Sequence, residues 1–273
     1  MLDVVEETVS IEDPLRARTY RGVVWRPREA SGALPLVVYS HPSGGSARSA
    51  AYLARHLAGH GYVVGALDHA ETFAPELQRA ADEDAVRRDA RAAGWIANRV
   101  PDLRLLVDAL LAGAAGVVVD PARVGAAGHS FGGWTAIAAA DEDPRLRAVV
   151  ALAPAGGEPT SPGTIPVTVR FARREGVALL IVAGEDDMSI PIEIVRELYT
   201  RAPEPKRLVV VPGADHLHFM EDGERIHEAF RTSPGPHSAI AARMRPFGEM
   251  TPIAEVQRIV YALTLQHVST YLM

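Results

Sequence analysis

The chain of 273 residues contains no cysteine. Disulfide bonds, thiolate metal sites and a cysteine nucleophile are therefore excluded, and the fold must depend on packing alone. The sequence also lacks a run of about 18 uninterrupted apolar residues, so no membrane span is expected. Its acidic beginning, Met1 to Glu7, has neither the basic start nor the apolar run of a secretory signal, which predicts a cytoplasmic protein.

No basic block occurs either. Lys and Arg number 28 against 34 Asp and Glu, which gives a formal charge of −6, and the arginines are spread along the chain. A nucleic-acid partner is therefore not expected. Apolar residues make up 48% and charged residues 23%, which is ordinary for a globular protein. The length fits one α/β domain over residues 1–273, whereas the oligomeric state cannot be read from the sequence.

Short apolar runs alternate with longer helical patterns from residue 34 onward, which predicts parallel strands joined by crossover helices. Two opening segments, 4–11 and 20–25, instead carry β-branched and aromatic residues at near-alternate positions, as expected of antiparallel strands at one edge of a sheet. The predicted inner strands are 36–39, 62–67, 123–127, 147–153, 177–183 and 208–211. The predicted helices are 47–60, 75–98, 102–112, 131–140, 191–201 and 253–271.

The strongest motif is Gly128-His129-Ser130-Phe131-Gly132, a G-x-S-x-G sequence between a predicted strand and a predicted helix. On such a tight turn the serine hydroxyl projects from the carboxyl edge of the sheet, and the two glycines let strand and helix approach closely. An ordinary glycine-rich turn with an inert serine is the alternative. The presence of the partners that a serine nucleophile needs favours the functional interpretation.

A serine hydroxyl needs a base to take its proton and a carboxylate to orient that base. Both residue types follow Ser130 in the chain, each on a loop after a predicted strand. Asp187 is the predicted acid, because its three-residue step from a glycine and the Ile-Pro that follows match the usual acid turn; Asp186 is its competitor. His216 is the predicted base, and His218 is its serious rival.

The negative charge that develops on the substrate oxygen needs two hydrogen-bond donors. One donor is the N–H of the residue after the nucleophile, here Phe131, and the second comes from the loop after an early strand. Pro42 in that loop has no N–H, so Ser43 is the predicted second donor. Three large apolar side chains near loop ends are predicted to line a substrate pocket: Trp134, Met188 and Phe219.

Residues 221–250 form a long connection after the histidine turn. Such a connection is either a lid over the site or a structural wrap, and the sequence does not separate the two. No metal or other cofactor is expected, because His216 and His218 lack a clear third ligand at suitable spacing.

Several stretches together resemble the dienelactone hydrolase and platelet-activating-factor acetylhydrolase-like branch of the α/β-hydrolases. They are the elbow around Ser130 and the segments 40–45, 57–69, 99–111, 184–191 and 213–219, within a likeness that extends over roughly residues 34–270. The resemblance implies the α/β-hydrolase fold, with an eight-stranded, mostly parallel sheet and helices on both faces. It also implies carboxylester hydrolysis without a cofactor, although the dienelactone hydrolases themselves use a cysteine nucleophile.

The sequence therefore predicts a serine hydrolase that cleaves a small-molecule ester through an acyl-enzyme, with Ser130, Asp187 and His216 as the catalytic residues. Cleavage of amides or thioesters, and acyl transfer to an alcohol, are alternatives on the same triad, because pocket shape selects the leaving group and the acceptor. A non-catalytic binding protein with the same fold is an alternative from another class.

Overall fold

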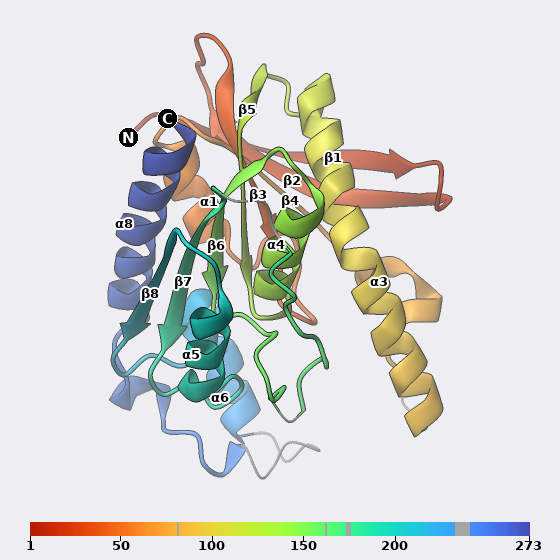
Figure 1. Ribbon diagram of the computed structural model, residues 1–273, viewed down its shortest axis with the longest axis vertical. Coiled ribbons are helices and arrows are strands. Elements are labelled where there is room, and N and C mark those ends of the chain that lie inside the picture. The colour runs from red at the N-terminus through yellow and green to blue at the C-terminus, as the bar shows by residue number, and fades with distance from the viewer. Residues whose placement is uncertain (81, 162, 173–175, 233–240) are drawn as a thin grey trace.

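The computed structural model describes residues 1–80, 82–161, 163–172, 176–232 and 241–273. Its eight-stranded sheet has the order β1-β2-β4-β3-β5-β6-β7-β8 (Figure 1). β1 is antiparallel to β2 and β2 to β4, whereas the other neighbours are parallel, which confirms the predicted mostly parallel sheet with an antiparallel edge. The strands are β1 (Val4–Asp13), β2 (Arg18–Pro27), β3 (Leu34–Ser40), β4 (Val63–Leu67), β5 (Val119–His129), β6 (Leu146–Leu152), β7 (Ala178–Gly184) and β8 (Lys206–Val211).

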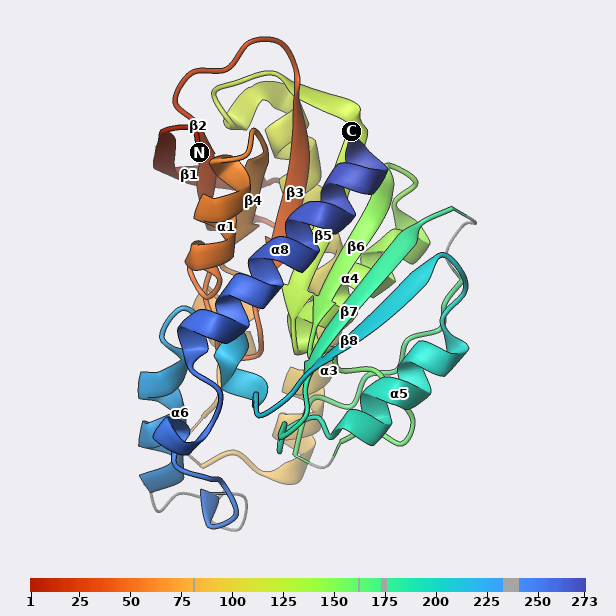
Figure 2. The same cartoon turned by 90° about the vertical axis from the view of Figure 1, so that its left-hand side faces the viewer.

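Helices cover both faces of this sheet, as predicted (Figure 2). α1 and α8 lie on one face and contact each other, while α3, α4 and α5 cover the opposite face. No helix in the described ranges is long and apolar enough to cross a membrane. The helices are α1 (Ala51–Ala58), α2 (Ala70–Phe73), α3 (Ala85–Ala109), α4 (Phe131–Glu142), α5 (Ile192–Arg201), α6 (Gly223–Thr232) and α8 (Ile253–Leu272), with short helical turns at η1 (Pro75–Leu77), η2 (Leu110–Ala114), η3 (His216–Phe219) and η4 (Phe247–Glu249).

The inner strands are apolar because each of their faces is covered. Every residue of β7 is buried, and so is the second half of β5, from Val124 to His129. Such strands stabilise the sheet by removing apolar surface from water on both sides. β1 lies at the sheet edge, and only Ile11 and Asp13 among its residues are buried. The buried centre of the sheet is therefore the part that carries the candidate site.

The prediction of two helices at 75–98 and 102–112, separated at Pro101, is wrong. A single helix, α3, passes through Pro101. Proline cannot donate the helical hydrogen bond and usually ends or kinks a helix. Arg99 and Asp102, on either side of the proline, are fully buried and hydrogen-bonded to other elements. These contacts hold the chain in the helical path in spite of the missing bond.

The connection at 221–250 contains α6 and η4. α6 packs against η3, the turn that begins at His216, beyond the edge where the parallel strands end (Figure 1). The Phe247 N–H donates a hydrogen bond to Glu228 at 2.7 Å, which ties η4 to α6. Residues 233–240 lie outside the described residues, so the suggestion of a lid stays a prediction.

Candidate active site

Three loops leave the sheet at one edge and at one level. His129 at the end of β5 pairs with Leu152 of β6, and Leu152 pairs with Val182 of β7. β7 and β8 end together, at the pair formed by Gly184 and Val211. The turns that carry Ser130, Asp187 and His216, which are called the serine elbow, the acid turn and the histidine turn, therefore begin at the same edge of the sheet.

Ser130 occupies the tight turn between β5 and α4. Its backbone has φ 58° and ψ −120°, and residues other than glycine rarely adopt such a positive φ. The Ser130 N–H donates a hydrogen bond to the Leu152 carbonyl at 2.9 Å. A Cβ atom on Gly128 would lie 2.1 Å from the Gly132 oxygen, and one on Gly132 would lie 2.0 Å from the Ser40 oxygen. Both glycines are therefore required by the close approach of strand, helix and the neighbouring loop.

His216 and Asp187 form a buried pair. His216 Nδ1 lies 2.7 Å from Asp187 Oδ2, and the other carboxylate oxygen accepts hydrogen bonds from the N–H groups of Ser189 and Ile190, each at 2.8 Å. Burial lowers the pKa of His216, but the charge and hydrogen bond of Asp187 outweigh this and hold the pKa above its ordinary value. When the neutral ring carries its proton on Nδ1 and donates it in the hydrogen bond to Asp187, its Nε2 is free to act as the base.

The two rival residues are engaged elsewhere. The Asp186 carboxylate accepts a hydrogen bond from the Arg245 guanidinium at 2.8 Å, on the protein surface. His218 is fully buried, and its Nδ1 accepts from the Asp215 N–H at 2.9 Å while its Nε2 donates to the Thr251 carbonyl at 2.9 Å. Both nitrogens of His218 therefore serve the local fold, and the structure brings Asp187 together with His216 only.

The neighbouring His129 links the elbow to the histidine turn. The centre of the His129 ring lies 4.5 Å from the centre of the His216 ring. Because His129 directly precedes Ser130, this contact brings the elbow next to the histidine turn. Burial, followed by the nearby His216, holds the pKa of His129 well below its usual value, so this ring is neutral. In the part of the chain that the structure describes, no hydrogen bond joins Ser130 Oγ to His216. Catalytic hydrogen bonds are often long without substrate and tighten when it binds.

The two predicted oxyanion donors lie on elements that touch. Phe131 is the first residue of α4, where the helix leaves its first N–H groups without a partner in the helix. Ser43 is exposed and lies in the turn closed by the hydrogen bond from Gly45 N–H to the Pro42 carbonyl, at 3.0 Å. This turn follows β3, next to the elbow.

The three predicted pocket residues have different surroundings. Met188 lines a cavity of about 500 Å³ beside the acid turn. Trp134 is only 8% exposed, stacks on Phe131 at 5.4 Å and donates its indole N–H to the Thr168 carbonyl. Phe219 is completely buried in the core and does not line this cavity, so its place in a pocket wall stays a prediction. The cavity is lined by Ser161, Glu185, Asp186, Asp187, Met188, Pro191, Ile192, Glu193, Asp215, His227, Arg243, Met244, Arg245 and Met250, a set without Ser130 or His216.

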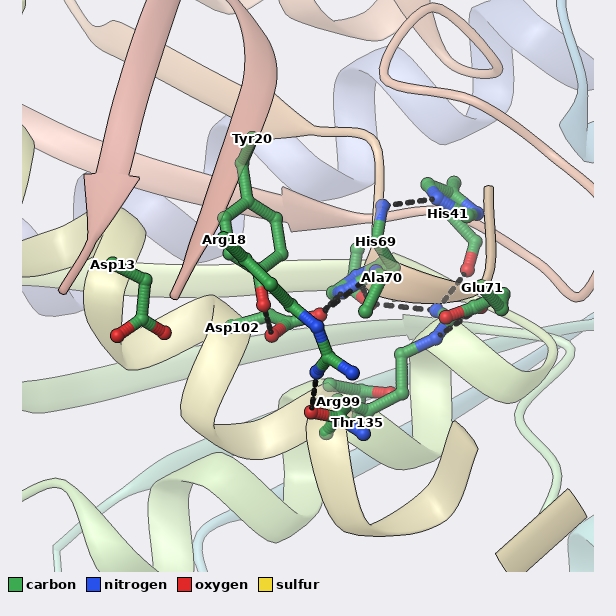
Figure 3. Close-up of polar contacts among 12 residues, drawn as sticks. Asp13, Arg18, Tyr20, His41, His69, Ala70, Glu71, Arg99, Asp102 and Thr135 are labelled. Carbon is green, nitrogen blue, oxygen red and sulfur yellow. Dashed lines mark hydrogen bonds and ion pairs between the residues drawn. The ribbon is translucent and has the colours of Figure 1, made fainter. Parts of the chain in front are cut away.

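A second Ser–His–Asp chain lies in the interior and was not predicted. Ser40 Oγ is 2.8 Å from His69 Nε2, and His69 Nδ1 is 3.1 Å from Asp102 Oδ2, as Figure 3 shows for the latter pair. All three residues are 0% exposed, so no substrate reaches this serine. Burial and the nearby Arg99 hold the pKa of His69 well below its usual value, which makes it a poor base. The signal available in the sequence was the position of Ser40 and His69, two polar residues at or just after the ends of the neighbouring strands β3 and β4.

A model of the dienelactone hydrolase family matches residues 20–238 of this chain. Two uncharacterized proteins of Mycobacterium tuberculosis are 29% identical over 244 residues, which cover 84% of this chain and 77% of theirs. Among solved structures, a Klebsiella pneumoniae protein described as a dienelactone hydrolase has a TM-score of 0.66 at 21% identity and covers 98% of this chain and 100% of its own. The ferulic acid esterase from Streptomyces cinnamoneus has a TM-score of 0.70 at 22% identity, and the match covers 99% of this chain and 90% of the esterase. These likenesses confirm the predicted α/β-hydrolase fold.

Proposed function

The chain belongs to the dienelactone hydrolase family, and on this premise we propose that it is a serine hydrolase that cleaves carboxylic esters through an acyl-enzyme. The observation that carries the proposal is the 2.7 Å contact between His216 and Asp187, at the rim where the elbow places Ser130. Ser130 is the proposed nucleophile because it stands on the elbow before α4, and the chain has no cysteine that could serve instead. An ester as substrate is in keeping with the esterase among its structural neighbours.

The proposed reaction begins with attack of Ser130 Oγ on the carbonyl carbon of the ester. His216 Nε2 takes the hydroxyl proton, and the Asp187 carboxylate stabilises the resulting imidazolium through Nδ1. The carbonyl oxygen becomes an oxyanion that accepts hydrogen bonds from the N–H groups of Phe131 and Ser43. As the C–O bond to the leaving group breaks, the alcohol takes the proton from His216. Water then attacks the acyl-enzyme by the same steps and releases the acid.

The test of this proposal is a Ser130→Ala variant assayed with p-nitrophenyl acetate and butyrate. We expect hydrolysis to fall to the uncatalysed background, while the circular dichroism spectrum and Tm stay close to those of the wild type, because a half-buried hydroxyl is exchanged for a hydrogen. Ser10→Ala, on the exposed face of the edge strand β1, is the matched control and is expected to keep full activity. Hydrolysis by the Ser130→Ala protein at the wild-type rate would show that another group is the nucleophile.

The remaining alternatives are separated by substrates and by a label. Amide, thioester and ester substrates of one acyl group, compared by kcat/KM, identify the preferred leaving group. A fluorophosphonate separates a hydrolase from a binding protein, because it reacts with an activated serine and not with an ordinary one.

A further inference from the structure

A buried guanidinium lies directly beneath the loop that supplies the proposed second oxyanion donor. Arg99 is 0% exposed, and its Nη1 donates to the His41 carbonyl at 2.6 Å and to Ser40 Oγ at 3.1 Å (Figure 3). Its Nη2 lies 3.5 Å from the Pro42 carbonyl. Its Nε donates to Glu71 Oε1 at 2.8 Å, so the charge is balanced by a carboxylate that is itself buried. Arg99 therefore contacts two successive carbonyls of the loop.

The hydrogen-bond partners of the polar groups around Arg99 determine which atom of each group carries the proton. The Ala70 N–H and Tyr20 hydroxyl donate to Asp102, as does His69 through Nδ1. His69 Nε2 then accepts from the Ser40 hydroxyl, whose lone pair is left for Arg99. This chain of hydrogen bonds begins at Tyr20 of β2 and ends at Ser40, at the start of the loop. One set of proton positions satisfies all of its hydrogen bonds.

His41 closes a second chain on the same loop. The His69 N–H donates to His41 Nε2 at 3.1 Å, which places the ring proton on Nδ1, and Nδ1 donates to the Pro42 carbonyl at 2.8 Å. Burial, then the charge of Arg99, holds the pKa of His41 well below its usual value and keeps it in this neutral form. The Pro42 carbonyl is thus held by donors from the loop and from α3.

The direction of that carbonyl determines the direction of the Ser43 N–H. The two groups belong to one peptide plane, and in a trans peptide they point to opposite sides. A carbonyl held toward the interior therefore turns the N–H of the next residue outward, toward the rim. The guanidinium of Arg99 also lies 4.4 Å from the ring centre of Phe131, the residue that carries the other proposed donor. Arg99 therefore contacts Phe131 and also the Pro42 carbonyl, which belongs to the same peptide plane as the Ser43 N–H.

We propose that Arg99 is a positioning residue for the oxyanion hole: it holds the His41 and Pro42 carbonyls so that the Ser43 N–H points at the substrate oxygen. The inference rests on the proposed serine hydrolase function. A buried ion pair is a weak source of stability, because removing both charges from water costs about as much as their attraction returns. Donors that are oriented before the reaction, in contrast, stabilise the charge of the transition state without any rearrangement.

The test is the double variant Arg99→Met/Glu71→Gln, which removes both charges and keeps similar volumes. The matched control is Arg91→Met/Glu83→Gln, because Arg91 of α3 forms a partly buried ion pair with Glu83, which lies just before that helix. Amide hydrogen exchange in the peptide that spans 40–46 measures the loop directly. kcat and KM for p-nitrophenyl butyrate, together with the inhibition constant of an alkyl boronic acid, measure the consequence for catalysis.

We expect exchange in 40–46 to become at least about tenfold faster in the Arg99 double variant and to stay unchanged in the Arg91 control. kcat should fall by about 10- to 100-fold, less than the 10²- to 10³-fold that follows loss of an oxyanion donor, with KM within about threefold. The boronic acid, which forms a tetrahedral adduct on the serine, should bind more weakly by the same factor as kcat falls. If the double variant does not fold, Arg99→Lys keeps the charge, cannot reach both carbonyls, and takes its place.

Unchanged exchange in 40–46, or a rise in KM with kcat preserved, would overturn the positioning role. Equal losses in the Arg99 and Arg91 variants would show a general effect of removing a buried pair. A wild-type protein without esterase activity would instead refute the proposed function, and the exchange rates would then still decide whether Arg99 holds the loop.

Discussion

Replacing Asp187 by asparagine removes one negative charge at 2.7 Å from His216 Nδ1 with almost no change of shape. The orientation of the new side chain follows from its surroundings. The N–H groups of Ser189 and Ile190 donate to Asp187 Oδ1, so the oxygen of an asparagine would take that position and its NH₂ group would face the imidazole. His216 Nδ1 would then have to accept a hydrogen bond and move its proton to Nε2, where it blocks the proton transfer from Ser130.

This change affects the reaction in two ways, through the wrong tautomer and through the lost charge on the imidazolium. Together they are expected to lower kcat/KM by about 10³- to 10⁴-fold, or about 4 to 5.5 kcal/mol in the transition state. The pH profile gives an independent sign. In the wild type, activity should rise with pH as His216, whose pKa is raised, loses its proton. In the variant the charge and hydrogen bond of Asp187 no longer raise this pKa, while burial still lowers it, so the acidic limb should move to lower pH while the plateau falls.

The assay is the initial rate of p-nitrophenyl butyrate hydrolysis between about pH 5 and pH 9, with Tm as the test of folding. The matched control is Asp186→Asn, which removes the adjacent charge from a surface pair with Arg245 and is expected to keep kcat/KM within about threefold. A loss of less than tenfold for Asp187→Asn, or a larger loss for Asp186→Asn, would refute the assignment of the acid.

Three further predictions concern stability. Gly128→Ala would place a carbon 2.1 Å from the Gly132 oxygen, so we expect a loss of at least about 3 kcal/mol of unfolding free energy, measured by urea titration; a loss under about 1 kcal/mol would contradict the close approach. Tyr20→Phe removes the 2.7 Å hydrogen bond to the buried Asp102 and should lower the unfolding free energy by about 1.5 to 3 kcal/mol in the same titration, whereas an unchanged value would show that the bond contributes nothing. Burial opposes the charged form of His227, but Asp215 and the Arg245 carbonyl raise its pKa above the ordinary value; this stabilisation is present below the unfolded pKa of about 6.5 and is lost as pH rises through the folded pKa. His227→Gln should therefore lower Tm more at about pH 6 than at about pH 9, and an equal loss at both pH values would exclude a charged His227.

The parts of the site that lie on local turns could be predicted from the sequence. The elbow around Ser130 is a short motif whose strand and helix are visible as apolar patterns on either side. The turns that carry Asp187 and His216 each follow a predicted strand, and parallel strands end at the same edge. The order of the chain was therefore enough to predict that these loops begin together.

The parts that depend on tertiary packing could not be predicted. Pro101 looks like the end of a helix until Arg99 and Asp102 are seen buried on both sides of it. Ser40 and His69 look like ordinary loop residues, because their shared environment exists only once β3, β4 and α3 are packed together. Sequence separations of this size leave no local pattern, so buried polar networks emerge only from the assembled core.

The most direct test of the central claim is to treat the protein with a fluorophosphonate and to locate the adduct by peptide mass spectrometry. The account predicts one adduct, on Ser130, whose rate of formation drops sharply in the Asp187→Asn protein. An adduct on Ser40, or no adduct on a protein that hydrolyses esters, would contradict it.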